Sequence, residues 1–101
     1  MMASILFGKI KSSALESWDK VSDPYDILEN DQEVSGIGAW DFMSIGKKIF
    51  GESKQIDWGS YAYKCNRTQL QQLVEQTGCS IKGLDEMNES EEYAIVFIEQ
   101  P

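Results

Sequence analysis

The sequence predicts a single α+β domain, in which an antiparallel or mixed sheet of three to four strands carries about three helices mainly on one face. Three observations support this prediction. Residues 4–10, 56–65 and 93–98 have the composition of strands, residues 39–50 and 67–77 have helical apolar spacing, and 101 residues suffice for one hydrophobic core. Because no linker or internal repeat divides the chain, we expect residues 1–101 to form one domain.

The first third of the chain predicts a strand, a helix and a loop. Residues 4–10 form the strand, and a short helix is expected within residues 12–23. Ser13 and Glu16 have the spacing of a capping box at its start. Pro24 should end this helix, because proline disfavours the helical conformation in the preceding residue. The polar, turn-rich residues 25–38 are expected to form a loop.

Residues 39–50 are expected to form a helix that packs on the core. Their apolar side chains recur at helical spacing, at Ala39, Phe42, Ile45 and Ile49. Gly51 follows as a C-terminal cap. Asp41 would then lie in the first turn and Lys47 and Lys48 in the last, where the helix dipole favours their charges.

The glycines around the same helix raise the question of a phosphate site, and their spacing excludes it. Gly36 and Gly38 would need a third glycine at position 41 to form a dinucleotide loop. Gly46 and Lys47 would need a glycine at the same position to form a nucleoside triphosphate loop. That position is Asp41, which would repel a phosphate.

The second half predicts a strand, a helix and a second strand. In residues 56–65, Tyr61, Tyr63 and Cys65 share one face, which predicts one strand with one buried side. Asn66, with Gln69 three residues later, is expected to cap the following helix. After a long acidic connection, the unbroken apolar run of residues 93–98 predicts a central strand covered on both faces or paired on both edges.

Acidic residues dominate the composition, with a formal net charge of −8 and a pI near 4.4. Two clusters carry most of them. The first is Glu16, Asp19, Asp23, Asp26, Glu29, Asp31 and Glu33, and the second is Asp85, Glu86, Glu89, Glu91 and Glu92. Such a field repels nucleic acid and anionic membranes and favours a basic protein partner. The alternative is that the acids only keep the domain soluble.

Catalytic and metal-binding motifs are not found in the sequence. The chain has no histidine, and its two cysteines lack the spacing of a zinc site. Cys65 precedes a predicted helix start, but a small core residue is the commoner role there. A calcium loop starting at Glu29 would need glycine where Val34 stands and glutamate where Trp40 stands. We therefore expect no enzyme, no metal and no cofactor.

The compartment expected is the cytoplasm. No window approaches the roughly 20 consecutive apolar residues of a membrane helix. The apolar start of the chain is expected to be the first strand of the fold and not a signal sequence. The two cysteines are expected to be reduced thiols.

These features lead to a hypothesis of a non-enzymatic protein that neutralises or regulates a basic protein partner. In composition and size the chain is similar to bacterial immunity proteins and other inhibitors of basic toxins or nucleases, although no motif is shared. The residues expected to bind the partner are Asp19, Asp23, Asp26, Glu29, Asp31, Glu33, Trp40, Trp58 and Tyr61. The alternatives are an accessory or housekeeping domain of a larger assembly and, less favoured, a small-molecule sensor or an enzyme that uses carboxylates.

The absence of a metal-binding motif predicts that chelators leave the protein's thermal stability unchanged. Thermal melts with and without EDTA should coincide, because no bound ion would be lost. A decrease in Tm of more than a few degrees on adding EDTA would contradict this expectation.

Overall fold

A computed structural model describes residues 2–100. The strands are β1 (Met2–Ile10), β2 (Leu28–Ser35), β3 (Lys54–Asp57), β4 (Ser60–Cys65), β5 (Ser80–Ile81) and β6 (Tyr93–Gln100). The α-helices are α1 (Ser12–Glu16), α2 (Ala39–Phe50) and α3 (Arg67–Thr77). Three short 3-10 helices are η1 (Trp18–Lys20), η2 (Pro24–Asp26) and η3 (Leu84–Glu86).

The strands form one antiparallel sheet in the order β3-β4-β6-β1-β2-β5. The α+β class with one antiparallel sheet and three α-helices is therefore confirmed. The expected number of three to four strands is wrong, because residues 2–100 form six. The added strands are β2, β3 and β5, which are either rich in polar residues or too short to show a period of two.

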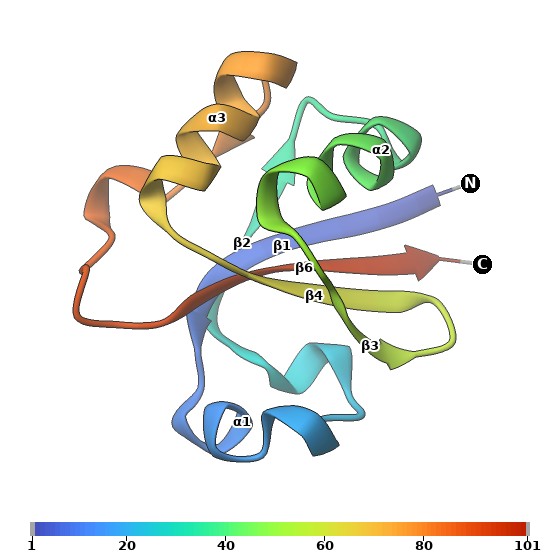
Figure 1. Cartoon of the computed structure of the whole chain (residues 1–101), viewed down its shortest axis with the longest axis vertical. Helices are drawn as coiled ribbons and strands as arrows, with labels where there is room; N and C mark the ends of the chain where they lie inside the picture. The colour runs from blue at the N-terminus through green and yellow to red at the C-terminus, as the bar shows by residue number, and fades with distance from the viewer. Residues whose placement is uncertain (1, 101) are drawn as a thin grey trace.

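The sheet is covered on both faces (Figure 1). Helices α2 and α3 lie on one face, and α1 with η1 and η2 lies on the other. The first face has a core that includes Phe42, Leu70 and Leu73. The second has a separate core that includes Ala14 and Ile27. Two apolar layers therefore enclose the sheet, with the two longest helices on the same side.

Strand β6 runs through the middle of the sheet, between β4 and β1. Residues 94–98 are all buried, and their side chains alternate between the two cores. Ile95 and Phe97 face α2 and α3, whereas Val96 and Ile98 face the α1 side. The prediction of a central strand at residues 93–98 is confirmed.

The predicted strand at residues 56–65 is instead a hairpin of β3 and β4. Trp58 and Gly59 form its turn. Strand β4 is also buried on both faces, because Ser60 and Ala62 lie against the α1 side while Tyr63 faces α2. The prediction of a single buried side was wrong. The second face is covered by α1, η1 and η2, and this tertiary contact is not visible in the local spacing of residues 56–65.

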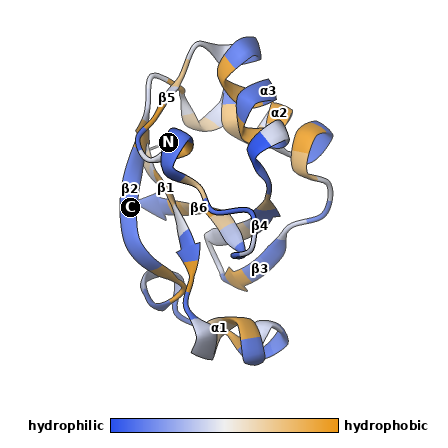
Figure 2. Ribbon diagram, turned by 90° about the vertical axis from the view of Figure 1, so that its left-hand side faces the viewer, coloured by the Kyte–Doolittle hydropathy of each residue, from blue (hydrophilic) through white to orange (hydrophobic). Residues whose placement is uncertain are grey.

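The predicted loop at residues 25–38 is wrong for most of its length, because it contains η2 and β2. In β2 only Leu28 and Val34 are buried, so the strand shows no apolar alternation. Its pairing with β1 includes a bulge, where Asn30 adopts a φ of +50° near Gly8. A Cβ atom at Gly8 would lie 2.9 Å from the Glu29 carbonyl oxygen, so this close approach requires glycine. Figure 2 shows β2 mostly in hydrophilic blue.

The first helix is shorter than expected, since α1 ends at Glu16 and η1 follows. The Ser13 and Glu16 capping box is also wrong. The N-cap is Lys11, which makes no side-chain capping hydrogen bond, and Ser13 contributes its carbonyl oxygen to a 2.8 Å hydrogen bond from the Ser17 hydroxyl. After α1, Trp18 packs on the second core, and its ring centroid lies 5.0 Å from Lys64 Nζ.

Helices α2 and α3 have the expected bounds. Gly51 caps α2, with its N–H bonded to the Lys47 carbonyl. In α3, Asn66 accepts a hydrogen bond from the Gln69 backbone N–H, and the Gln69 side chain accepts one from the Asn66 N–H, both at 2.9 Å. Gly78 ends α3 with a φ of +73°.

The capping box of α3 predicts the effect of Asn66→Ala. Alanine cannot accept the Gln69 N–H, so the free energy of unfolding should fall by about 0.5–2 kcal/mol. Urea unfolding should show a lower midpoint with an unchanged slope. Gln72→Ala, an exposed change in the middle of α3, is the control and should keep the parental midpoint. An Asn66→Ala midpoint equal to the parental one would contradict the cap.

Candidate functional site

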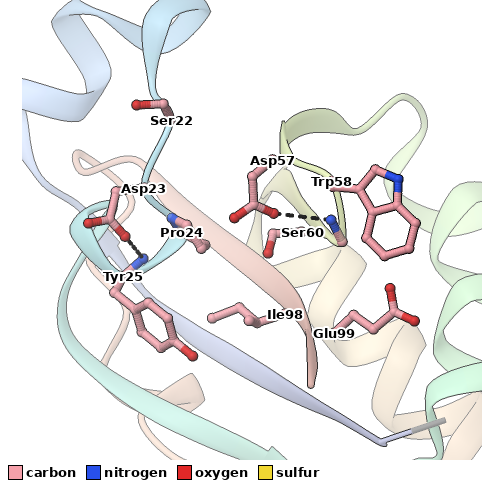
Figure 3. A pocket seen from close by; sticks show the side chains of 10 residues that line it. Ser22, Asp23, Pro24, Tyr25, Asp57, Trp58, Ser60, Ile98 and Glu99 are labelled. Atoms are coloured by element: carbon pink, nitrogen blue, oxygen red, sulfur yellow. Dashed lines mark hydrogen bonds between the residues drawn. The ribbon is translucent and has the colours of Figure 1, made fainter. Parts of the chain in front are cut away.

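A groove lies on the α1 side of the sheet, between η2 and the β3–β4 turn (Figure 3). It has a volume of about 780 Å³ and is open to solvent. Three separate segments of the chain form it. They contribute Ser22, Asp23, Pro24 and Tyr25 from around η2, Asp57, Trp58, Gly59 and Ser60 from the turn, and Ile98 and Glu99 from β6.

The β3–β4 turn forms one wall of the groove. The Asp57 carboxylate accepts a hydrogen bond from the Gly59 N–H at 3.1 Å, which closes the turn. The Gly59 carbonyl accepts the Glu99 N–H at 2.9 Å and so ties the turn to β6. A Cβ atom at Gly59 would lie 2.9 Å from the Glu99 carboxylate, so glycine leaves room for that side chain. This turn presents Trp58 with 88% of its surface exposed.

The opposite wall is the start of η2. The Asp23 carboxylate accepts the Tyr25 N–H at 2.9 Å and serves as the N-cap. Pro24 is buried and lines the groove beside Asp23. Tyr25 is 64% exposed, and its ring lies across the groove from the Trp58 ring (Figure 3). The groove is therefore bounded by two exposed aromatic side chains on two different elements.

Ile98 and Ser60 lie between the two walls. Ile98 is buried and provides an apolar surface. Ser60 is only 2% exposed and is the one buried polar residue identified within residues 2–100. Its hydroxyl is therefore almost completely covered by the protein. No hydrogen bond joins this hydroxyl to any other side chain drawn in Figure 3.

The groove is acidic. Asp23, Asp57 and Glu99 approach it from three segments, and no lysine or arginine lines it. Each aspartate uses one carboxylate oxygen for a backbone hydrogen bond, which orients the side chain and leaves the second oxygen available. The groove therefore carries negative charge that no lining residue balances.

The structure brings only two of the predicted partner-binding residues, Asp23 and Trp58, together at this groove. The aromatic residues are separated. Trp40 is 69% exposed on α2, on the other side of the sheet. Tyr61 also faces that side, where it is partly buried and its ring centroid lies 6.4 Å from that of Phe97. Tyr61 is therefore part of the packing around the core.

The predicted acidic cluster is spread over α1, η1, η2 and β2, and several of its members have partners. Asp26 pairs with Lys11 at 2.8 Å and raises the pKa of that lysine by hydrogen bonding and charge. Glu29 lies 3.6 Å from Lys9, and Glu91 lies 3.3 Å from the same lysine. The hydrogen bond and charge of Glu91 are the main cause of the raised pKa of Lys9.

Four other members of the cluster are exposed and lie outside the groove. Glu16 is on α1, Asp19 is on η1, and Asp31 and Glu33 are on β2. None of them belongs to an ion pair found within residues 2–100. Of the whole first cluster, Asp23 alone lines the groove.

The groove also contains Tyr25, Asp57, Ser60, Ile98 and Glu99, which were not predicted from the sequence as site residues. The signal for part of this set was the stretch Asp57-Trp58-Gly59-Ser60, because aspartate followed by glycine two residues later is typical of a tight turn. Because residues 56–65 were predicted to form one strand, this turn was not recognised. No local sequence pattern predicts that Tyr25 and Glu99 line the same groove, because only the folded sheet brings them together.

Within residues 2–100 the structure shows no cluster of metal ligands, and the Cys65 thiol is not activated. No group of three or more potential ligands could hold a metal ion in this part of the chain. Both cysteines are free, and burial raises the pKa of Cys65 to about 12. Its thiol is therefore protonated at neutral pH, as expected for a residue packed at the core. The described helices include none with the length and apolar character needed to cross a bilayer.

Comparisons with protein-family models, curated proteins and solved structures found no match to this chain. Its function therefore has to be inferred from the groove and from the charges around it.

The raised pKa of Cys65 predicts slow alkylation of the folded protein. At pH 8 iodoacetamide should label Cys65 far more slowly than a free thiol, and the rate should increase as the pH approaches 12. The rate is measured by mass spectrometry in a Cys79→Ala background. The same variant in guanidinium chloride is the control and should react rapidly. Rapid labelling of the folded protein at pH 8 would contradict the burial of this thiol.

Proposed function

We propose that this protein is a non-enzymatic binding protein that neutralises or regulates a basic protein partner, in the manner of an immunity or inhibitor protein. The groove is the anchor of the contact. The observation that supports this proposal is the combination of two exposed aromatic rings with three carboxylates and no basic residue in one hollow. We further propose that the protein is cytoplasmic, because its two free cysteines are compatible with a reducing compartment.

The two kinds of side chain have different roles in such a contact. Trp58 and Tyr25 offer large surfaces that lose solvent only when a partner covers them, and such residues commonly contribute most of the binding energy. The carboxylates and the net charge of −8 attract a basic partner before contact and increase its association rate. The rings are therefore expected to govern dissociation and the acids association.

A stable interface must extend beyond the groove, because a typical one buries about 800 Å² on each partner. A smaller hollow of about 230 Å³ adjoins the groove and shares Ser22 and Asp23 with it. Its lining includes Asp26, which faces solvent although it is paired with Lys11. The partner surface is therefore proposed to continue from the groove along η2.

The acids of β2 support a second candidate function, an accessory domain whose charges only keep it soluble. Strand β5 pairs with β2 only at Val34 and Ser35, so much of that sheet edge is open. Charged residues on an edge strand oppose edge-to-edge association between molecules. This role would account for Glu29, Asp31 and Glu33. It does not account for the groove carboxylates, which are not on this edge strand.

To test the proposal, a partner is first isolated with the parental protein. Its binding kinetics are then measured at two salt concentrations. Asp23→Asn, Asp57→Asn and Glu99→Gln combined should slow association about tenfold at low salt and flatten its salt dependence. The asparagines retain the oxygen that accepts the backbone hydrogen bond, so both turns should persist. Trp58→Ala should instead accelerate dissociation and cost about 2 kcal/mol or more.

The control is Asp85→Asn, Glu86→Gln and Glu89→Gln combined. It changes the net charge by the same amount at residues outside the groove and should bind nearly as the parent does. Failure to isolate a basic partner, or parental kinetics in both groove variants, would refute the proposal and favour solubilising acids.

A further inference from the structure

The groove offers hydrogen-bond acceptors on more than one side. Figure 3 shows the Asp57 and Glu99 carboxylates on the Trp58 side and the Asp23 carboxylate on the Tyr25 side. The Gly59 N–H donates to the Asp57 carboxylate, and the Tyr25 N–H donates to the Asp23 carboxylate. These hydrogen bonds hold both carboxylates in place before a ligand binds. A ligand with several donors in one plane uses such separated acceptors better than one with all its donors at a single point.

The base of the groove is unfavourable for a strongly hydrated ion. Ile98 is apolar, and Ser60 offers one hydroxyl at 2% exposure. An ammonium group would lose much of its hydration there, whereas a guanidinium group is more weakly hydrated.

No cation–π contact to Trp58 or Tyr25 is found within residues 2–100. The cation–ring contact found within residues 2–100 joins Lys64 to Trp18, which is not part of the groove. Trp58 and Tyr25 remain 88% and 64% exposed. An ammonium can also sit over a ring face, as Lys64 does over Trp18, but only a planar guanidinium can stack parallel to the ring while its N–H groups donate in its own plane.

The groove is large enough for a segment of a polypeptide chain. Its volume of about 780 Å³ lies within the roughly 300–1,000 Å³ range of ligand sites. It therefore has room for an arginine side chain and for the backbone beside it. A second copy of this chain, with its net charge of −8, would be repelled and is a poor occupant.

We infer that the groove receives an arginine side chain from an extended segment of the partner, in preference to lysine. This inference rests on the proposed function and specifies the group that the partner inserts. The guanidinium stacks against Trp58 or Tyr25 and donates to the carboxylates of Asp57, Glu99 or Asp23, while the neighbouring backbone crosses Ile98.

The test uses two peptides of equal charge, acetyl-Gly-Ser-Arg-Ser-Arg-Ser-Gly-amide and its counterpart with lysine at both basic positions. Binding to the full chain is measured by NMR from the Gly59 amide and the Trp58 indole N–H, with the Trp40 indole as the internal control. The arginine peptide should bind about tenfold more tightly and move the groove signals but not that of Trp40.

Trp58→Leu tests whether the ring creates the preference. Leucine keeps an apolar side chain at the tip of the turn but removes the aromatic face, so the difference between the peptides should shrink to about twofold or less. Binding is followed there from the Gly59 amide. Trp40→Leu is the matched control and should retain the full preference. Persistence of the full preference in Trp58→Leu would overturn the stacking role.

The outcomes separate this inference from the proposed function. Equal binding of both peptides at the groove, or tighter binding of the lysine peptide, would overturn the arginine preference and leave a basic partner in place. No movement of the Gly59 and Trp58 signals by either peptide at millimolar concentration would overturn both the inference and the role of the groove. Movement of the Trp40 signal instead would assign binding to α2 and also overturn both.

Discussion

The burial of β6 on both of its faces is the constraint on which the rest of the structure depends. Residues 94–98 of this strand are almost inaccessible to solvent, and their side chains alternate between two apolar cores. A sheet with such a strand at its centre is unstable unless both faces are covered. Helices α2 and α3 cover one face, and the residues from α1 to η2 cover the other (Figure 1). Because that second cover is short, it leaves the end of β6 at Ile98 and Glu99 beside an open groove.

The acidic residues divide into groups with different environments. Asp26 and Glu29 face lysines across short distances, and such exposed pairs contribute little to stability. Asp31 and Glu33 lie on β2, whose edge is largely open, where charge opposes association between sheets. Asp23, Asp57 and Glu99 surround an apolar hollow. Net charge alone therefore does not identify the candidate site, whereas the position of each carboxylate relative to apolar surface does.

The exposure of Trp58 is not required by the fold. A tryptophan at the tip of a two-residue turn contributes almost no buried surface, and a polar residue could occupy the same position without loss of packing. Ser60 presents the complementary case, since it is buried beside the groove although a hydroxyl gains nothing from an apolar setting. The Trp58 ring loses its contact with solvent only if a partner covers the groove.

The sequence by itself determined the elements whose signals are local. Helix α2 is specified by apolar spacing and Gly51, helix α3 by Asn66 and Gln69, and β6 by an unbroken apolar run. In each case the interacting atoms lie within a few residues of one another, so periodicity and capping chemistry predict the outcome.

Only the tertiary structure decided that residues 28–35 form a strand and that the β3–β4 hairpin has both faces buried. Strand β2 is held by backbone hydrogen bonds to β1, which depend little on its polar side chains. The groove likewise joins residues 22–25, 57–60 and 98–99, which have no local relation to one another. The sequence indicated Asp23 and Trp58 individually, but their neighbours are set by the order of strands in the sheet, and that order depends on contacts between distant residues.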